Sequence, residues 1–304
     1  MTPGPSRLVV RPGPADLALL TVAVLGVSAS APIIVAASAP GLAIALWRNV
    51  MGSAVLLPLS VLRAPGEIAG LSRRERRLVV VAGLALAAHF GTWVPSVTLT
   101  TVASAVALGT TAPVWNALIA RAQGHAVPRR AWAGIAVSLV GVLLLTGVDV
   151  AVSREALAGD LLALAGGFFG AVYVALGGEV RRTVSTSTYS ALCYSTCSVV
   201  LLPVCLVAGV ALGGYDGRTW LLLVALTITA QLLGHTLFNA VVGRVGPLVV
   251  ALAVLLEVPG AAVLAAVWLG QVPPLAALPA ALLVLLGVAM VVTTAAPEAA
   301  EPAA

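Results

Sequence analysis

The chain consists of long apolar runs that short polar breaks separate. Each run has about the twenty residues that an α-helix needs to cross ~30 Å of hydrocarbon, whereas a membrane β-barrel would show shorter strands of alternating polarity. The pattern therefore predicts transmembrane helices, whose ends are marked by arginines and by Pro or Gly. We place ten helices at residues 16–38, 42–62, 76–97, 101–121, 130–148, 157–180, 186–211, 218–241, 246–269 and 274–294.

Composition supports the prediction of an all-α integral membrane protein. Of the 304 residues, 61% are hydrophobic and only 9% are charged. The mean hydropathy of +1.10 is far outside the range of soluble globular domains. Residues 1–14 contain Pro, Gly and Arg but no continuous apolar core, so we do not interpret them as a cleavable signal peptide.

The arginines predict the orientation of the helices. All 16 basic residues are arginines, and with a cytoplasmic N-terminus all but Arg48, Arg154 and Arg218 fall in cytoplasmic segments. Because positive charge concentrates in the cytoplasmic loops of membrane proteins, we expect both termini in the cytoplasm, as a tail of residues 1–15 and a disordered tail of residues 295–304. Arginine without lysine, together with abundant Ala, Val, Leu and Gly, suggests a GC-rich bacterial genome. The expected location is thus the plasma (inner) membrane of a bacterium.

The basic isoelectric point of about 9.7 does not indicate nucleic-acid binding, because the arginines lie between apolar spans. Cys193, Cys197 and Cys205 share one apolar helix without a neighbouring His or Cys pair. They predict neither a metal site nor a disulfide framework, and we interpret them as small apolar residues. We expect no cofactor and no nucleic acid as partner. The lipid bilayer is an expected partner, and we expect a monomer or a homodimer.

The two halves of the sequence resemble each other. A shift of 146 residues brings Pro113 onto Pro259 without a gap, and the same shift places Thr111 on Glu257. Each half would hold five helices, and because five is odd, the second half enters the membrane from the opposite side. Such inverted repeats are typical of secondary transporters, whose substrate site lies near the bilayer midplane between the halves. The predicted repeats are residues 16–148 and 157–294.

Several motifs carry a resemblance to a known family. They are LWRN (46–49), TTAPVWNALIARAQG (110–124), GIAVSLVGVLLLTG (134–147) and VGPLVVALAVLLEVPGAAVLAAVWLGQ (245–271). On these segments the chain resembles the EamA-like family of the drug/metabolite transporter superfamily, in its form with ten helices and two EamA repeats. The resemblance implies a transporter, with a central cavity lined by helices that include the third, fourth, sixth, eighth and ninth.

Glu257 is the most informative polar residue in the predicted spans. It lies about 16 Å along the ninth helix, close to the midplane, and Pro259 is predicted to deprive the carbonyl of Leu255 of its helical hydrogen bond. A carboxylate at this depth costs on the order of 3 kcal/mol and requires a partner, a wet cavity or a function. Two interpretations stay open. Glu257 either makes a permanent hydrogen bond across the bundle, or it lines the pathway and binds a proton or a cationic group of the substrate.

Polar residues also recur every four positions along the eighth helix, at Thr227, Gln231, His235 and Asn239. This spacing places them on one helix face. The stripe either forms interhelical hydrogen bonds or lines an aqueous cavity. A histidine there can titrate near neutral pH or bridge in the neutral form.

Further candidates lie on three other helices. His89 and Trp93 share a face of the third helix, although an interfacial position also explains Trp93. Thr111 and Trp115 lie one turn apart on the fourth helix, and Tyr173 lies on the sixth. Aromatic side chains and a histidine suit a partly apolar, amphipathic solute.

Arg48 lies about 9 Å below the outer end of the second helix. From there its side chain can snorkel outward or form a structural pair, or it can contact a carboxylate of the substrate or the acidic outer loop.

The sequence favours a secondary transporter that exports small organic metabolites, either amino acids or amphipathic drug-like solutes, by alternating access. No ATP-binding motif is present, so a gradient must drive transport, and proton coupling stays undecided. One alternative is an intramembrane enzyme, but no HExxH, GxSxG, paired Asp or Cys/His grouping occurs, and we predict that the chain is not an enzyme. A channel or receptor is the other alternative, which the inverted repeat disfavours.

Overall fold

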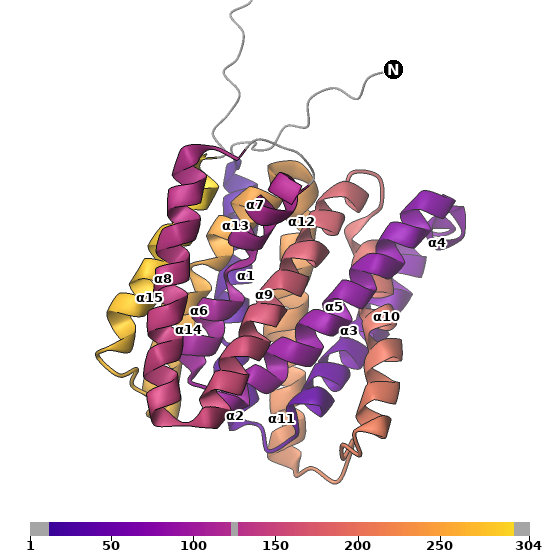
Figure 1. The fold of residues 1–304 in the computed structure, drawn as a ribbon. Coiled ribbons are helices and arrows are strands. Elements are labelled where there is room, and N and C mark those ends of the chain that lie inside the picture. The colour runs from indigo at the N-terminus through magenta and orange to yellow at the C-terminus, as the bar shows by residue number, and fades with distance from the viewer. Residues whose placement is uncertain (1–11, 123–126, 295–304) are drawn as a thin grey trace, which may run out of the picture.

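The computed structural model describes residues 12–122 and 127–294, and within these ranges all regular secondary structure is helical (Figure 1). The first 11 residues and the predicted tail 295–304 lie outside the described residues. In the first half the helices are α1 (Pro14–Ser28), α2 (Ser30–Ala36), α3 (Gly41–Arg63), α4 (Glu67–Gly70), α5 (Arg73–Leu99), α6 (Val102–Gly109), α7 (Ala112–Ala122) and α8 (Arg129–Val152).

The second half repeats this arrangement. Its elements are α9 (Arg154–Val180), α10 (Thr186–Val207), α11 (Gly217–Leu226), the π-helix η1 (Thr227–His235), α12 (Thr236–Val245), α13 (Pro247–Val254), α14 (Glu257–Leu269) and α15 (Ala277–Thr294). Consecutive segments join into ten crossings, and the ends of every crossing lie within four residues of the sequence prediction. Seven described spans are long and apolar enough to cross a membrane by length and composition alone.

Polar caps start several of the helices at the membrane faces. Ser72 and Glu75 form a capping box at the start of α5, in which each side chain binds the backbone N–H of the other residue. Ser153, Ser185 and Asp216 cap α9, α10 and α11 in the same way, through backbone N–H groups three residues onward. Because the first N–H groups of a helix have no partner within it, these residues determine where each span begins.

The two halves pack in a two-fold pattern. The most extensive contacts join α5 with α9, α8 with α15, and α3 with α10, while α1 packs on η1 and α12. In terms of crossings, the second pairs with the seventh and the fifth with the tenth, whereas the third meets the sixth just as the eighth meets the first. Each contact between the halves is therefore matched by an equivalent contact when the two halves are exchanged. This is the packing expected of two related five-helix repeats.

Both halves contain a broken helix at the same place. The fourth crossing is interrupted between α6 and α7, and the ninth between α13 and α14. Pro113 and Pro259 lie in the first turns of α7 and α14, where a missing N–H needs no partner. The prediction that the carbonyl of Leu255 is free is therefore wrong, because this oxygen accepts a hydrogen bond from the N–H of Val258 at 3.3 Å. The chain tightens at the break and satisfies the carbonyl locally.

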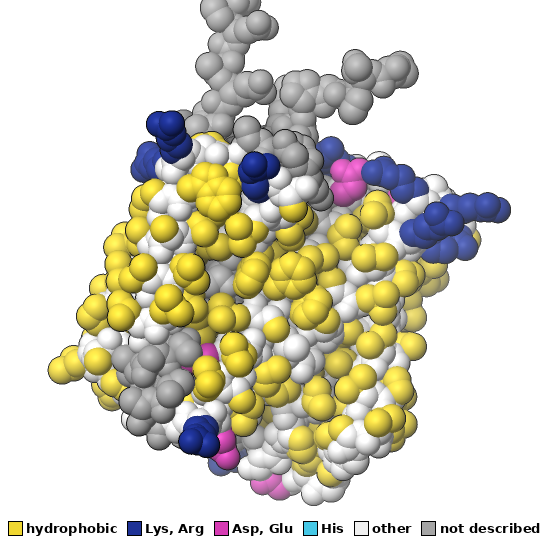
Figure 2. Space-filling model, in the orientation of Figure 1, with side chains coloured by type: hydrophobic (Ala, Val, Ile, Leu, Met, Phe, Trp, Pro, Cys, Tyr) yellow, Lys and Arg dark blue, Asp and Glu magenta, His cyan; other side chains and the backbone are white. Residues whose placement is uncertain are grey.

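On the face shown in Figure 2, most arginines lie at one end of the molecule and hydrophobic side chains cover its middle. Many aliphatic residues of the spans are strongly exposed, among them Val199 and Leu143, and their side chains would face lipid. The same end holds ion pairs between described residues, including Arg74 with Glu179 at 2.8 Å and Arg244 with Asp16 at 2.6 Å. We call this end, which carries Arg74 and Arg244, the arginine face.

A close backbone contact joins α8 and α15, and it predicts a large effect of one methyl group. A Cβ atom at Gly287 would meet the backbone nitrogen of Ser138 and the carbonyl oxygen of Gly134. We expect Gly287→Ala to destabilise the protein by roughly 1–3 kcal/mol, because neither backbone can move aside cheaply. Thermal unfolding in detergent measures the effect. Gly213→Ala is the matched control, since nothing lies within 4 Å of its Cβ position, and equal melting temperatures of the two variants would contradict this packing.

Glu67 links the α3–α5 connection to the start of α10. Its carboxylate accepts hydrogen bonds from the backbone N–H of Ser185 at 2.7 Å and from the hydroxyl of Thr188 at 2.5 Å. Burial by itself raises the pKa of Glu67, but the hydrogen bonds from Ser185 and Thr188 outweigh it, so the pKa lies below its ordinary value of 4.5. The ionised carboxylate therefore stabilises the folded state above its ordinary pKa, and this contribution is lost as the pH falls through the lowered value.

Glu67→Gln should accordingly lower the melting temperature at pH 7 by an amount that shrinks as the sample is acidified below pH ~4.5. The measurement is thermal unfolding of wild type and variant in detergent across this pH range. A difference between the two proteins that stays constant with pH would contradict the role of the ionised form.

Candidate functional site

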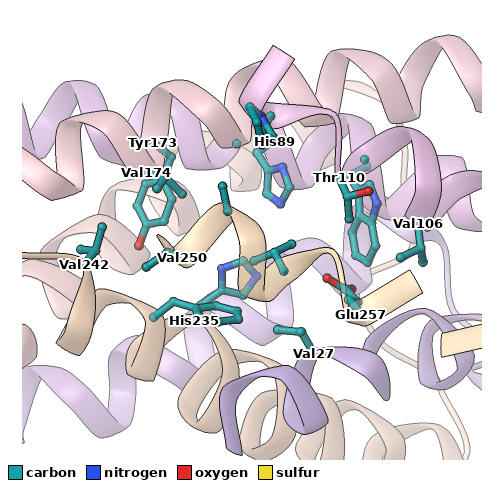
Figure 3. Close-up of a pocket in the computed structure, with 18 of the residues that line it drawn as sticks. Val27, His89, Val106, Thr110, Tyr173, Val174, His235, Val242, Val250 and Glu257 are labelled. Atoms are coloured by element: carbon teal, nitrogen blue, oxygen red, sulfur yellow. The ribbon is translucent and has the colours of Figure 1, made fainter. Parts of the chain in front are cut away.

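A cavity of about 110 Å³ lies between the two halves, near the breaks in the fourth and ninth crossings (Figure 3). Its walls come from α5, α6, α7, α9, η1, α12, α13 and the first residue of α14, and the first crossing closes one side with Val27 and Ser30. Most of the lining is apolar. The volume is well below the ~300–1,000 Å³ of pockets for drug-sized ligands, so the site as it stands fits a small solute.

The cavity occupies the half of the molecule nearer the arginine face. Its walls include α7, α12 and α13, which run between the breaks and that face in Figure 1. Toward the other face, α6 and α14 pack against each other and against α2. The opposite side of the cavity is therefore closed by the outer halves of the two broken helices.

Asn239 and Tyr173 form one polar wall. The amide nitrogen of Asn239 donates to the hydroxyl of Tyr173 at 2.6 Å and to the hydroxyl of Ser190 at 3.0 Å. The Tyr173 ring stacks on Tyr189 with centroids 6.0 Å apart. These contacts fix two hydrogen-bonding side chains, both of them sequence-predicted candidates, at the edge of the cavity.

Histidines and aromatic rings form a second wall. His89 stacks on Trp93 with centroids 6.1 Å apart, and the His235 ring lies 6.1 Å from the His89 ring. Nδ1 of His89 lies 2.8 Å from the carbonyl oxygen of Gly166, which can only accept, so Nδ1 carries the proton and a neutral His89 keeps Nε2 as an acceptor. Trp93 is only 6% exposed. Its interpretation as an interfacial residue is therefore wrong, because its ring packs between helices in the protein interior.

Glu257 begins α14, and its carboxylate reaches the cavity near Thr110 and His235 (Figure 3). The residue is 8% exposed. Among the described residues, no group donates a hydrogen bond to the carboxylate or forms an ion pair with it. Of the two interpretations of Glu257, the geometry therefore matches a cavity-lining carboxylate rather than a permanently bonded one.

Arg48 does not snorkel toward a membrane surface, because it is fully buried. Its Nε donates to Oε1 of Gln231 at 2.8 Å, and its guanidinium lies 4.2 Å from the centroid of the Phe90 ring. Nη1 lies 3.5 Å from the hydroxyl of Ser30, which lines the cavity. Snorkelling fails as a prediction because these contacts with other helices hold the side chain in the core.

The polar stripe of the eighth crossing divides between two roles. Gln231 is fully buried and donates through Nε2 to Asn49 at 3.0 Å, in addition to its bond with Arg48, and Thr227 bonds to the carbonyl of Leu223. His235 and Asn239, nearer the arginine face, line the cavity. Gln231 and Asn239 therefore make interhelical hydrogen bonds, and His235 and Asn239 lie on the cavity wall. Three residues of the stripe, Thr227, Gln231 and His235, lie in the π-helix η1, whose wider turns change the spacing on which the single-face argument rests.

Thr111 and Trp115 lie beside the cavity, not on its walls. The hydroxyl of Thr111 donates to the carbonyl of Leu108 at 2.7 Å and accepts from the indole N–H of Trp115 at 3.2 Å. The ring of Trp115 packs on Phe168 with centroids 5.5 Å apart. The neighbouring Thr110 lines the cavity instead, because the break after α6 rotates the chain.

Sequence reasoning missed several wall residues. Asn116 lies three residues after Pro113 and Phe238 lies three residues after His235, so helical spacing could have found both. Ser30 gives no signal of its own, since it is one of several small residues near a kink between α1 and α2. In the described ranges, no group of three or more His, Cys, Asp and Glu residues could hold a metal ion.

The model of the EamA-like transporter family matches residues 15–147 and again residues 157–293. This chain belongs to the EamA-like transporter family. The two matches coincide with the two five-helix halves, so the fold consists of two EamA repeats. Membership makes the protein a multi-pass membrane transporter rather than an enzyme.

Individual proteins also resemble this chain. An uncharacterized transporter from Archaeoglobus fulgidus is 32% identical over 114 residues, which make up 37% of this chain and 39% of the relative. The match thus spans less than half of that curated relative. A known crystal structure aligns with 93% of this chain and 99% of its own, with a TM-score of 0.67 and 20% identity, and this likeness concerns the fold alone.

Proposed function

We propose that this EamA-family member is a secondary transporter that exports small organic metabolites across the plasma membrane by alternating access. The observation that carries the proposal is the cavity where the broken helices of both repeats meet, with a carboxylate, two histidines, Tyr173 and Asn239 on mostly apolar walls. Transporters bind their substrates at such breaks between repeats, because rocking of one repeat against the other exposes the same site to either side.

The arginine face is the cytoplasmic side in this proposal. Positive charge concentrates on the cytoplasmic side of membrane proteins, and the cavity lies in the half of the bundle nearer these arginines. A solute would therefore enter from the cytoplasm, while the packed α6 and α14 segments close the outer side. This arrangement supports export as the direction of transport.

A gradient supplies the energy, and we propose that Glu257 takes part in coupling. A carboxylate in the cavity without a donor in the described part of the protein can bind a proton in one step and release it in another. His89 and His235 also line the cavity and can accept protons. The ring of His89, however, is already hydrogen-bonded to the carbonyl of Gly166. Glu257 is therefore the group whose exchange of a proton would least disturb the surrounding packing.

Transport assays in liposomes test this function. Purified protein is reconstituted, and uptake of a panel of radiolabelled amino acids and amphipathic amines is measured with and without a pH gradient. We expect uptake of at least one class above empty liposomes, and faster uptake when the gradient drives protons in the opposite direction. Equal rates in both conditions would reject proton coupling, and no uptake of any solute would reject the transport proposal.

A further inference from the structure

Two opposite charges are buried in the bundle without touching each other. Arg48 is 0% exposed and Glu257 is 8% exposed. They interact electrostatically, yet they form no ion pair in the described part of the chain. Burying an ion without a counter-ion is costly, and buried charges in proteins are normally paired and hydrogen-bonded. Each of these two charges therefore lacks the partner that its burial requires.

The Arg48 guanidinium is only partly satisfied by neutral groups. Its Nε donates to Gln231 at 2.8 Å, and Nη1 lies at 3.5 Å from the Ser30 hydroxyl, the limit of a hydrogen bond. Nη2 is buried and has no hydrogen-bond partner among the described residues. Guanidinium groups pair best with carboxylates, which accept two parallel N–H bonds. Arg48 thus keeps a donor suited to an oxyanion.

Arg48 lies directly behind the wall of the cavity. Ser30 lines the cavity and contacts Nη1, and His235 lines it while its ring lies 5.2 Å from the Phe90 ring on which the guanidinium rests. Glu257 lines the same cavity. A positive charge behind Ser30 and a negative charge at Glu257 therefore face one small, largely apolar space.

We propose that the cavity binds a small zwitterion, whose ammonium group pairs with Glu257 and whose carboxylate is held by Ser30 and Arg48. This inference rests on the proposed transport function and specifies the substrate class of that site. A zwitterion gives both buried charges a counter-ion and adds no net charge to the low-dielectric interior, whereas an amine leaves Arg48 unpaired and an acid leaves Glu257 unpaired. The apolar walls, which include Val27 and Val174, suit an aliphatic side chain.

Three probes that share one hydrocarbon body separate the contributions of the two charges. They are leucine, the amine 3-methylbutylamine and the acid 4-methylpentanoate, so that only the charged groups differ. Binding is measured as thermal stabilisation of the full-length protein in detergent, and transport as uptake into liposomes. In wild type, leucine should bind at least about tenfold more tightly than the amine or the acid, since each lost charge-assisted contact costs roughly this factor.

Two variants assign each charge. Arg48→Gln should make leucine and the amine bind equally, and Glu257→Gln should make leucine and the acid bind equally. Each result is a ratio of two probes on one preparation, so a reduced yield of folded protein does not affect it. Ser30→Ala is a milder test of the contacts with the carboxylate of the substrate. It should reduce the preference for leucine over the amine and leave the preference for leucine over the acid in place.

The outcomes distinguish the substrate class from the transport function. Equal binding of leucine and the amine by wild type, or no stabilisation by any of the three probes, would overturn the zwitterion site. Unchanged probe ratios in Arg48→Gln would do the same. Leucine binding that shows these ratios without any leucine uptake would uphold the site and refute transport, whereas uptake without a preference for leucine would uphold transport and refute the site.

Discussion

Glu257→Gln is expected to abolish the stimulation of transport by a pH gradient and to lower the rate with the gradient by about tenfold or more, which corresponds to ~1.4 kcal/mol of lost interaction. Glutamine has nearly the same shape but cannot bind or release a proton at neutral pH. The carboxylate faces the cavity and makes no hydrogen bond with the described part of the protein, so the substitution should leave the packing intact. Uptake into liposomes at several pH gradients measures the effect.

Glu155→Gln is the matched control for this experiment. Glu155 is exposed near the start of α9, at the end of the molecule opposite the arginine face. It should tolerate the same chemical change without loss of transport. If Glu257→Gln retained the full response to the gradient, the carboxylate would have no part in coupling, and Glu257 would be left with the binding of an ammonium group alone.

Filling the cavity should stop transport without unfolding the protein. Ala251 on α13 lines the cavity and is partly exposed, so Ala251→Trp places a large ring in a space of about 110 Å³. We expect at least a tenfold loss of uptake, because the solute and the indole cannot occupy the same volume. The loss should appear for every solute that the wild type transports, since it depends on volume and not on charge.

Val267→Trp on α14 serves as the control for the added ring. Val267 is 83% exposed, on a surface that would face lipid, where a tryptophan is tolerated. Both variants should melt close to wild type, and only Ala251→Trp should lose uptake. Full uptake by Ala251→Trp would show that the solute does not pass through this cavity.

Much of the fold follows from the sequence because hydrocarbon imposes strict rules. Every backbone polar group in a bilayer must be satisfied within a helix, so apolar runs separated by arginines are sufficient to place ten crossings. The matching Pro113 and Pro259 revealed the repeat, and the structure gives their reason, since each restarts a broken helix beside the cavity. These features are local, and local chemistry is what a sequence pattern records.

The candidate site was predictable in part, for a related reason. His89, Tyr173, His235 and Asn239 line the cavity together with Glu257, as expected of polar side chains that would be unfavourable against lipid. The prediction was less successful where the backbone leaves regular α-helical geometry. Thr111 lies at the break after α6 and contacts Trp115, and Gln231 lies in a π-helix and bonds to Arg48.

The sequence by itself therefore determined the ten helices and the two repeats, because length, polarity and proline act within one helix. Only the tertiary structure decided what surrounds each of the two buried charged side chains. Arg48 meets Gln231 from 183 positions away and lies behind Ser30, while Glu257 faces the cavity without a partner in the described chain. Such pairings depend on which helix faces lie against each other, and that arrangement is a property of the packed bundle rather than of any one helix.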